Sequence, residues 1–258
     1  MTKNPPSDDA YPILASLFVK KRFKKHEINV NSLSLAILEL IKDGQIKCEI
    51  ESEDSHTIGK KLTEKDMEVM KGITLRIANK GELKTSQTQA INILKTMNKS
   101  KKFNLKDMLK NGRTPSTANR FKSDFLEFRK AVEMENNFTP ECYRNILEKG
   151  KLTKNGKELK KEWESYQDYL KSESLSEKFP PESADENASQ IIYGACFNIE
   201  RETLDLRKKD SLLADFIDKD GYKMLNIIFN NTLSSSTEKS KGTGIFYGVN
   251  DKYTIPSA

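Results

Sequence analysis

The sequence predicts a mostly α-helical fold with small β wings: two winged-helix-like units followed by a C-terminal helical extension. Glycine and proline are few, 12 and 8 of 258 residues, which favours helices over a turn-rich sandwich. Several segments also repeat apolar residues at helical spacing behind a capping residue. A third observation is local: Asn31–Glu51 places a helix, a glycine turn and a strand in succession.

The first unit is predicted from that segment. Asn31 or Ser32 suits an N-cap, and Asp43-Gly44 ends the helix because glycine accepts the left-handed conformation. Apolar and polar residues alternate over residues 45–51, the period of a half-buried strand. A polar tip at 52–56 and a returning strand at 57–62 would complete the layout of helix and wing.

A new helix is expected after Thr63, with Asp66 three residues on as an approximate capping box. Its inward face would carry Val69, Ile73 and Ile77. Further helices are predicted downstream, each with one apolar face. They are Ser86–Met97, a short helix ended by Asn111-Gly112, a long helix behind Thr114-Pro115 with Ala118, Phe121, Phe125, Phe128 and Val132 inward, 154–172 with Leu159, Trp163, Tyr166 and Leu170 inward, and Ser189–Arg207.

The domain division follows from these segments and from two stretches of altered composition. Pro5-Pro6-Ser7-Asp8-Asp9 cannot pack as an element, and Ser172–Asn187 is rich in Ser, Glu and Pro. The predicted division is a tail at 1–9, a first winged-helix-like unit at 10–84, a second at 85–175, a helical extension at 176–233 and a loose tail at 234–258.

Charge is unevenly distributed along the chain. The net charge is +6, with +9 in residues 1–175 and −3 in residues 176–258. An excess of this kind suits nucleic acid or an anionic membrane surface, and it is also common on ordinary soluble proteins.

The cysteines and the apolar runs indicate a cytoplasmic chain. Cys48, Cys142 and Cys196 are far apart and form no CxxC pair, so neither a disulfide framework nor a structural zinc site is expected. They are predicted to be small buried residues in a reduced compartment. The longest apolar run, Leu33–Ile41, is far short of the roughly 20 residues that cross a bilayer. The polar start of the chain does not read as a signal peptide.

Three phrases together resemble one family. They are Ser34–Ile41 running into Gly44-Gln45-Ile46, Leu62-Thr63-Glu64 before a helix, and Leu152–Lys157 running to Trp163, Tyr166 and Tyr169-Leu170. In order and distance they resemble the cytosolic portion of the YciQ-like predicted membrane proteins, a family of unknown function, over roughly residues 5–210. The resemblance implies tandem winged-helix units on the cytosolic side of a transmembrane helix. It implies no catalytic residues, and this chain departs from the family in having no membrane span of its own.

Catalytic, metal and cofactor sites are not predicted. The two histidines, His26 and His56, lie in no HExxH pattern. The sequence has no GxSxG, Walker or GxGxxG motif. Asp215, Asp218 and Asp220 precede Gly221, but their spacing does not match a calcium loop, so a plain turn is expected.

Two basic runs are the candidate anion contacts. The candidate residues are Lys20, Lys21, Arg22, Lys24, Lys25, Lys101 and Lys102. A solvated face is the plainer interpretation of each run, and Lys20–Lys25 would also suit anionic lipid headgroups. Against DNA stand the four acids of the wing, Glu49–Asp54, because acids repel phosphate. The expected outward residues of the helix also include two acids; these residues are Ser34, Glu39, Lys42 and Asp43.

The function expected from the sequence is a non-enzymatic interaction or regulatory module, at the cytosolic side of a membrane protein. A protein partner is expected and a membrane surface is compatible. The alternative is a nucleic-acid-binding winged-helix regulator, which the acidic wing disfavours. An enzyme with an unrecognised site ranks last.

Overall fold

The computed structural model describes residues 5–6, 15, 28–51, 55–59, 62–78, 81–98, 100–135, 147–148, 151–207 and 211–236. The helices are α2 (Val30–Lys42), α3 (Glu64–Lys71), α4 (Thr85–Met97), α5 (Leu105–Gly112), α6 (Pro115–Glu135), α8 (Lys154–Lys171), α9 (Glu173–Lys178), α10 (Ala184–Cys196), α11 (Glu200–Leu206), α12 (Leu212–Asp218) and α13 (Gly221–Ser234). The strands are β1 (Ile46–Ile50), β2 (Ile73–Ile77), β3 (Lys102–Asn104), β4 (Leu147–Glu148) and β5 (Lys151–Leu152). The prediction of a mostly helical chain with a little β-structure is confirmed.

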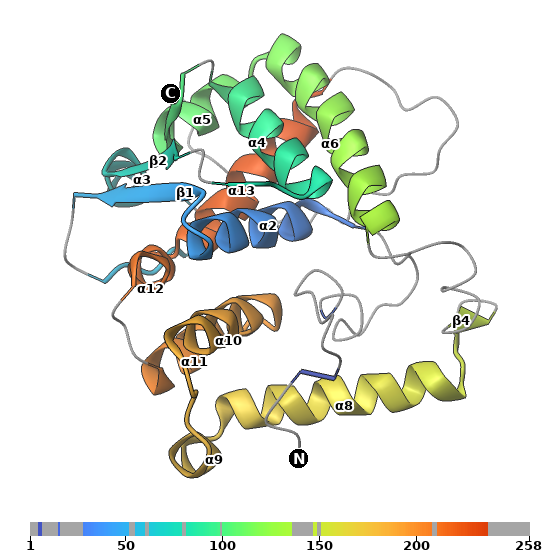
Figure 1. Cartoon of the computed structure of the whole chain (residues 1–258). Helices are drawn as coiled ribbons and strands as arrows, with labels where there is room; N and C mark the ends of the chain where they lie inside the picture. Colours follow the sequence, from blue (N-terminus) through green and yellow to red (C-terminus); the bar gives the residue numbers. More distant parts are fainter. Residues whose placement is uncertain are drawn as a thin grey trace.

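Helix α2 lies at the centre of the molecule (Figure 1). It packs against α4, α10, α12 and α13 and against strand β1. Every residue from Ser32 to Ile41 is buried, including Ser34 and Glu39. The expectation that Ser34 and Glu39 face outward is therefore wrong. A helix surrounded by neighbours has no solvent face, and the near-continuous apolar run Leu33–Ile41 is the pattern of such a helix.

The sheet joins segments far apart in sequence. Strands β1, β2 and β3 form one antiparallel sheet in that order. Its inner face packs on α2 and α12. The predicted partner of β1 was residues 57–62, but the described residues of that stretch form no strand and β1 pairs with β2 instead.

The helix expected to run through Ile77 ends at Lys71. Buried and less buried residues alternate over Ile73–Ile77, which is the two-residue period of a strand. The i, i+4 spacing of Val69, Ile73 and Ile77, which suggested a helix, was therefore misleading. Glycine at position 72 separates helix from strand.

Helices α4, α5, α6 and α13 pack together on one side of α2. The predicted inward face of α6 is confirmed, since Phe121, Phe125 and Phe128 are all buried. Phe121 also stacks on Phe229 of α13, with ring centroids 5.8 Å apart. Helix α5 approaches α13 so closely that a Cβ on Gly112 would lie 2.0 Å from Oγ1 of Thr232.

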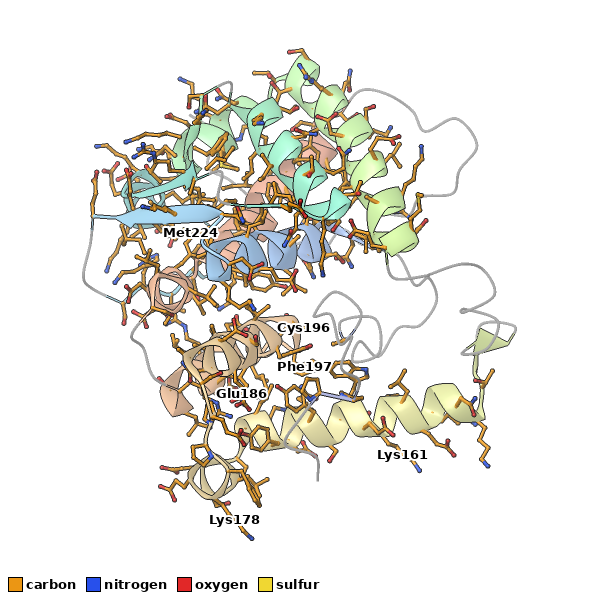
Figure 2. The ribbon with its side chains drawn as sticks, viewed as in Figure 1. Lys161, Lys178, Glu186, Cys196, Phe197 and Met224 are labelled. Carbon is orange, nitrogen blue, oxygen red and sulfur yellow. The ribbon has the colours of Figure 1, made fainter. Side chains whose placement is uncertain are left out.

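On the other side of α2, the long helix α8 packs beneath α10 and α11. Trp163 and Tyr166 of α8 contact Tyr193 of α10, with centroid distances of 5.7 and 5.3 Å. The predicted apolar face of α8 is thus confirmed. Figure 2 shows Lys161 on the opposite side of α8, pointing away from α10.

The predicted helix Ser189–Arg207 is two helices in the structure. Helix α10 begins earlier, behind an N-cap at Ser183, and ends at Cys196; α11 begins at Glu200. Asn198 turns the chain between them with φ of 57°, which asparagine tolerates better than most residues. Ser172 and Ser183 are the N-caps of helices α9 and α10. Both helices begin within Ser172–Asn187, the stretch whose composition suggested a domain boundary.

The sheet takes β1 and β2 from the first predicted unit and β3 from the second. Helix α13, assigned to the extension, packs against α2, α5 and α6. The sheet and the apolar core therefore both extend across the predicted boundary at residue 84. The predicted tails at 1–9 and 234–258 lie almost entirely outside the described residues. Across the described helices, no stretch is both long and apolar enough to cross a bilayer.

The prediction for the cysteines is confirmed at two positions. Cys48 on the inner face of β1 and Cys196 on α10 are both buried, and neither forms a disulfide. Burial, with the nearby carboxylates of Asp215 and Glu49, raises the pKa of Cys48 to about 12. Its thiol therefore stays protonated at neutral pH and is a poor nucleophile. Cys142 lies outside the described residues.

Candidate functional site

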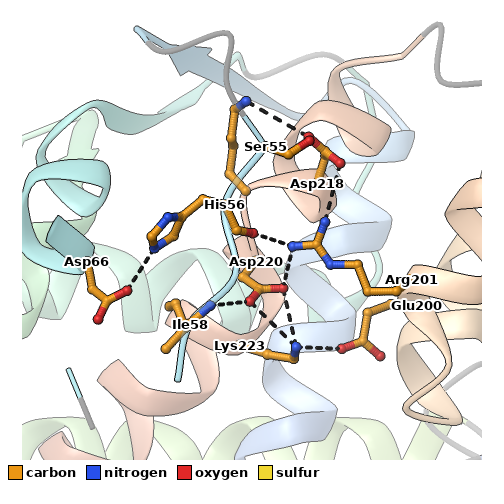
Figure 3. A network of polar contacts seen from close by, with 10 residues as sticks. Ser55, His56, Ile58, Asp66, Glu200, Arg201, Asp218, Asp220 and Lys223 are labelled. Atoms are coloured by element: carbon orange, nitrogen blue, oxygen red, sulfur yellow. Dashed lines mark hydrogen bonds and ion pairs between the residues drawn. The ribbon is translucent and has the colours of Figure 1, made fainter. Parts of the chain in front are cut away.

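Charged groups from three parts of the chain meet where α11, α13 and the loop before α3 come together (Figure 3). We call Glu200, Arg201, Asp218, Asp220 and Lys223 the charged cluster. Glu200 and Arg201 open α11, Asp218 ends α12, Asp220 is the N-cap residue of α13, and Lys223 lies one turn into α13. Residues 55–59 run alongside it.

Arg201 is the hub of the charged cluster. Its Nη1 donates to Oδ1 of Asp218 at 3.3 Å, and its Nη2 donates to Oδ1 of Asp220 at 2.9 Å and to the backbone carbonyl of His56. Asp220 is fully buried and also accepts from the backbone N–H of Ile58 at 2.6 Å. A charge-assisted network of this kind fixes the loop to the two helices.

Beside the three acids, Lys219 supplies a second base, with Nζ 3.9 Å from Oδ2 of Asp218, and Lys223 supplies the third. Nζ of Lys223 lies 3.3 Å from Oδ1 of Asp220 and 3.5 Å from Oε1 of Glu200. The carboxylates of the charged cluster are therefore bound by neighbouring bases and backbone N–H groups. A general base needs an oxygen within reach of a substrate proton. The carboxylate oxygens of Asp218 and Asp220 are engaged within the fold, whereas Oε2 of Glu200 is buried with no hydrogen-bond partner among the described residues. Asp220 adopts the left-handed conformation, φ 56°, in the turn at residues 219–220 between α12 and α13.

His56 and Asp66 form a buried pair beside the charged cluster. Nε2 of His56 lies 2.7 Å from Oδ1 of Asp66. Asp66 Oδ2 accepts from the backbone N–H and the hydroxyl of Thr63 at 2.6 and 2.7 Å, which confirms the predicted capping box. Burial acts to raise the pKa of Asp66, but the hydrogen bonds from Thr63 and His56 outweigh it and hold that pKa below its usual range. His56 belongs to the predicted polar tip at 52–56, where a solvent-exposed side chain would be expected, yet it is only 7% exposed.

The lowered pKa of Asp66 predicts a pH dependence of stability. A carboxyl group with a lowered folded-state pKa stabilises the fold above its unfolded value, about 4, and that stabilisation is lost as pH falls further. Asp66→Asn is expected to lower the free energy of unfolding by about 1–3 kcal/mol at pH 7. This difference between the wild-type protein and the variant should become smaller towards pH 2. Urea unfolding at a series of pH values measures this, with Asp168→Asn on the exposed face of α8 as the control. A difference in the free energy of unfolding that is equal at pH 7 and pH 2 would contradict this prediction.

The outer face of the sheet carries the second group of charges. We call Lys47, Glu49, Thr74, Arg76, Lys102 and Asn104 the sheet face; they alternate with the buried residues of β1, β2 and β3. Lys47 pairs directly opposite Arg76, and Arg76 directly opposite Lys102. Three exposed bases thus form one row across three adjacent strands.

Glu49 is the one acid on the sheet face, and two bases share it. Its carboxylate lies 3.3 Å from Lys102 Nζ and 4.0 Å from Arg76 Nη1. Like charges placed directly opposite on neighbouring strands are unfavourable, and one shared, exposed acid offsets this only in part. Of the wing Glu49–Asp54, Glu49 lies on this face and Glu51 is exposed at the end of β1, while residues 52–54 lie outside the described residues.

The predicted anion contacts are in part brought together with this face. Lys101 and Lys102 are exposed at β3, as a candidate contact requires. Lys20, Lys21, Arg22, Lys24 and Lys25 lie outside the described residues. Lys47 and Arg76 were missed because each is a single base in its own strand. Only the strand register puts them beside Lys102; the alternation in residues 45–51 was the sole local signal.

A pocket of about 660 Å³ lies between α9, α10 and the end of α11. Glu173, Glu177, Glu182 and Asp205 line it, together with Arg207. Nε of Arg207 donates to Oε1 of Gln190 at 2.5 Å, which holds the guanidinium against the wall. The acidic lining does not suit an anionic ligand. Within the described part of the chain, no three His, Cys, Asp or Glu side chains are grouped to hold a metal ion.

Comparison with known proteins gave no match to any protein-family model, curated protein or solved structure.

Proposed function

We propose that this chain is a non-enzymatic interaction module, the cytosolic soluble portion of a longer membrane protein. The observation that carries the proposal is the sheet face. Its row of Lys47, Arg76 and Lys102 weakens the sheet electrostatically and is only partly compensated by the described residues. Residues that break a local rule of stability are characteristic of functional surfaces, and a basic row on an exposed sheet suits an anionic partner.

Two further features support the proposal. The carboxylates of the charged cluster, the most enzyme-like group described, are bound to Arg201, Lys223 and the backbone of residues 55–59, so the cluster serves to hold elements together. The phrases shared with the YciQ-like family, such as Leu152–Lys157 running to Trp163, support attachment to a membrane protein.

The winged-helix interpretation is part of the proposal for residues 85–152. Helix α4, strand β3, helices α5 and α6, and the hairpin β4–β5 follow one another in the order of a winged helix. Only Arg113 and Thr114 separate α5 from α6, the close succession of a helix-turn-helix. For residues 31–62 the proposal keeps helix α2 and strand β1 but not the hairpin.

Fractionation of the cells that make the protein tests the proposal. An antibody raised against this chain should detect it in the membrane pellet, with detergent releasing it and alkaline carbonate or high salt leaving it in place. Those washes remove peripheral proteins, whereas a membrane span resists them. Recovery in the soluble fraction, or release by salt alone, would contradict attachment to a membrane protein.

A nucleic-acid-binding regulator is the second candidate, favoured by the first turns of α6. Arg113, Ser116 and Arg120 are exposed there, and the second helix of a helix-turn-helix is the one that enters the major groove. Retardation of duplex DNA at about 50 mM salt, lost in Arg113→Gln/Arg120→Gln, would support this candidate. Absence of retardation at that salt would exclude it.

A further inference from the structure

We propose that the sheet face contacts the anionic lipid headgroups of a bilayer. This inference rests on the proposed function and names the partner of the surface on which that function depends.

The bases of the sheet face form a band of fixed geometry. Lys47, Arg76 and Lys102 are in register on adjacent strands, and neighbouring strands lie about 4.8 Å apart. Their attachment points thus span about 10 Å on one side of the sheet. With three bases and one acid, the face keeps a positive balance.

The positive surface continues beyond the strands. Nδ2 of Asn104 donates to the backbone carbonyl of Lys71 at 2.5 Å, which places the end of α3 beside the sheet face. There Glu68 is shared by two bases, Lys106 at 2.9 Å and Lys71 at 3.5 Å. Glu49 and Glu68 are thus each contacted by two bases, and Glu51 and Asp107 are two further exposed acids of this region. The six bases of the region outnumber these four acids; they are Lys47, Lys71, Arg76, Lys101, Lys102 and Lys106.

The residues of the sheet face favour headgroups over nucleic acid. The face has no aromatic side chain on which a base could stack. Its one amide, Asn104, donates to the carbonyls of Lys71 and Ile73 and to the hydroxyl of Thr74, so it is engaged within the fold. An anionic bilayer requires only positive charge on an accessible face, and each Lys or Arg near its surface adds to the attraction.

The contact would be electrostatic and reversible. No apolar side chain lies on the sheet face to insert among the acyl chains. Charge alone gives weak membrane binding, which becomes stable when a second attachment holds the domain at the surface. The membrane attachment in the proposed function supplies that second attachment.

Vesicle flotation with the full 258-residue chain tests the inference. Vesicles of phosphatidylcholine alone are compared with vesicles containing about 30% phosphatidylglycerol, at about 0.1 M salt. The chain should float with the anionic vesicles only, and about 0.5 M salt should release it. Lys47→Gln/Arg76→Gln/Lys102→Gln should lower the partition coefficient at least about tenfold.

A matched control removes the same charge from another face. Lys154→Gln/Lys157→Gln/Lys161→Gln takes three exposed bases from α8 and should change the partition coefficient less than about twofold. Glu49→Gln tests the opposite change. Removing the acid shared by Arg76 and Lys102 should raise the partition coefficient about fivefold. Circular dichroism and thermal unfolding establish that each variant is folded.

Several outcomes would overturn the inference. Unchanged flotation of the sheet-face variant, or an equal loss in the α8 control, would show that the sheet face is not the contact. No flotation of the wild-type chain, together with DNA retardation that the sheet-face variant abolishes, would assign the face to nucleic acid. The proposed function fails separately, if the native protein is not retained by membranes after carbonate.

Discussion

Replacing Arg201 with methionine is expected to lower the free energy of unfolding by about 3 kcal/mol. The change keeps an apolar stem of similar length but removes the hydrogen bonds to Asp218, Asp220 and the His56 carbonyl. Asp220 would stay fully buried with only Lys223 and the Ile58 N–H as partners. Removing one partner of a buried ion pair costs about 3–5 kcal/mol. Because Lys223 and the Ile58 N–H still bind Asp220, we expect a value at the lower end of this range.

Urea unfolding at pH 7 measures the effect of Arg201→Met. Arg120→Met on α6 is the control, since its ion pair with Asp124 is 4.0 Å long and mostly exposed, and a change within about 0.5 kcal/mol is expected. Asp220→Asn supplies a second test from the other side of the pair, because asparagine also accepts the left-handed backbone at this position. If both Arg201→Met and Asp220→Asn unfold like the control, the charged cluster does not hold these elements together.

Gly112→Ala is expected to destabilise the fold by about 1–3 kcal/mol. A methyl group there would lie 2.0 Å from Oγ1 of Thr232 and 3.0 Å from Cε of Met97, closer than atoms can pack. The helices α5 and α13 would have to separate or Thr232 would have to leave its buried hydrogen bond to the carbonyl of Ile228. Thermal and urea unfolding measure the loss.

The double variant Gly112→Ala/Thr232→Ala isolates the contact between the helices. Removing Oγ1 of Thr232 leaves its Cβ 3.1 Å from the new methyl, a contact that small shifts relieve. The double variant should therefore recover part of the stability lost in Gly112→Ala, a non-additivity typical of touching residues. Strictly additive effects would contradict the close approach of α5 to α13.

Helices with one apolar face were predictable because their signals are local. The helix α6 begins at Pro115 behind Thr114, as capping chemistry predicts, and its phenylalanines recur at helical spacing. Helix α8 was found in the same way from Trp163 and Tyr166. In both, the residues that define the element lie within one or two turns of each other.

The sheet was not predictable from local pattern, because its pairing is set by segments distant in sequence. Strand β1 has two candidate partners of suitable composition, residues 57–62 and 73–77, and only packing on α2 and α12 selects the second. The burial of α2 on all sides has the same origin. Ser34 and Glu39 look like surface residues, and the helices around them are encoded far downstream.

The candidate site was found only in part, for the same reason. Lys101 and Lys102 stand out as a basic run, whereas Lys47 and Arg76 acquire meaning through the register of three strands. The charged cluster was not predicted, although Asp218 and Asp220 stood out before Gly221, because Arg201 approaches His56 and Asp220 approaches Ile58 across more than 140 residues of chain. Side chains assembled by the fold in this way carry no short motif.

Lysine acetylation footprinting tests the sheet face as an interaction surface most directly, because it does not depend on the identity of the partner. The native protein in the membranes of the cells that make it is compared with the purified chain, and each lysine is quantified by mass spectrometry. Lys47, Lys101 and Lys102 should be acetylated more slowly in the membranes, while Lys154, Lys157 and Lys161, exposed on α8, should react equally in both. Equal reactivity of the sheet-face lysines in both preparations, or protection confined to the α8 lysines, would contradict the assignment of the sheet face as the interaction surface.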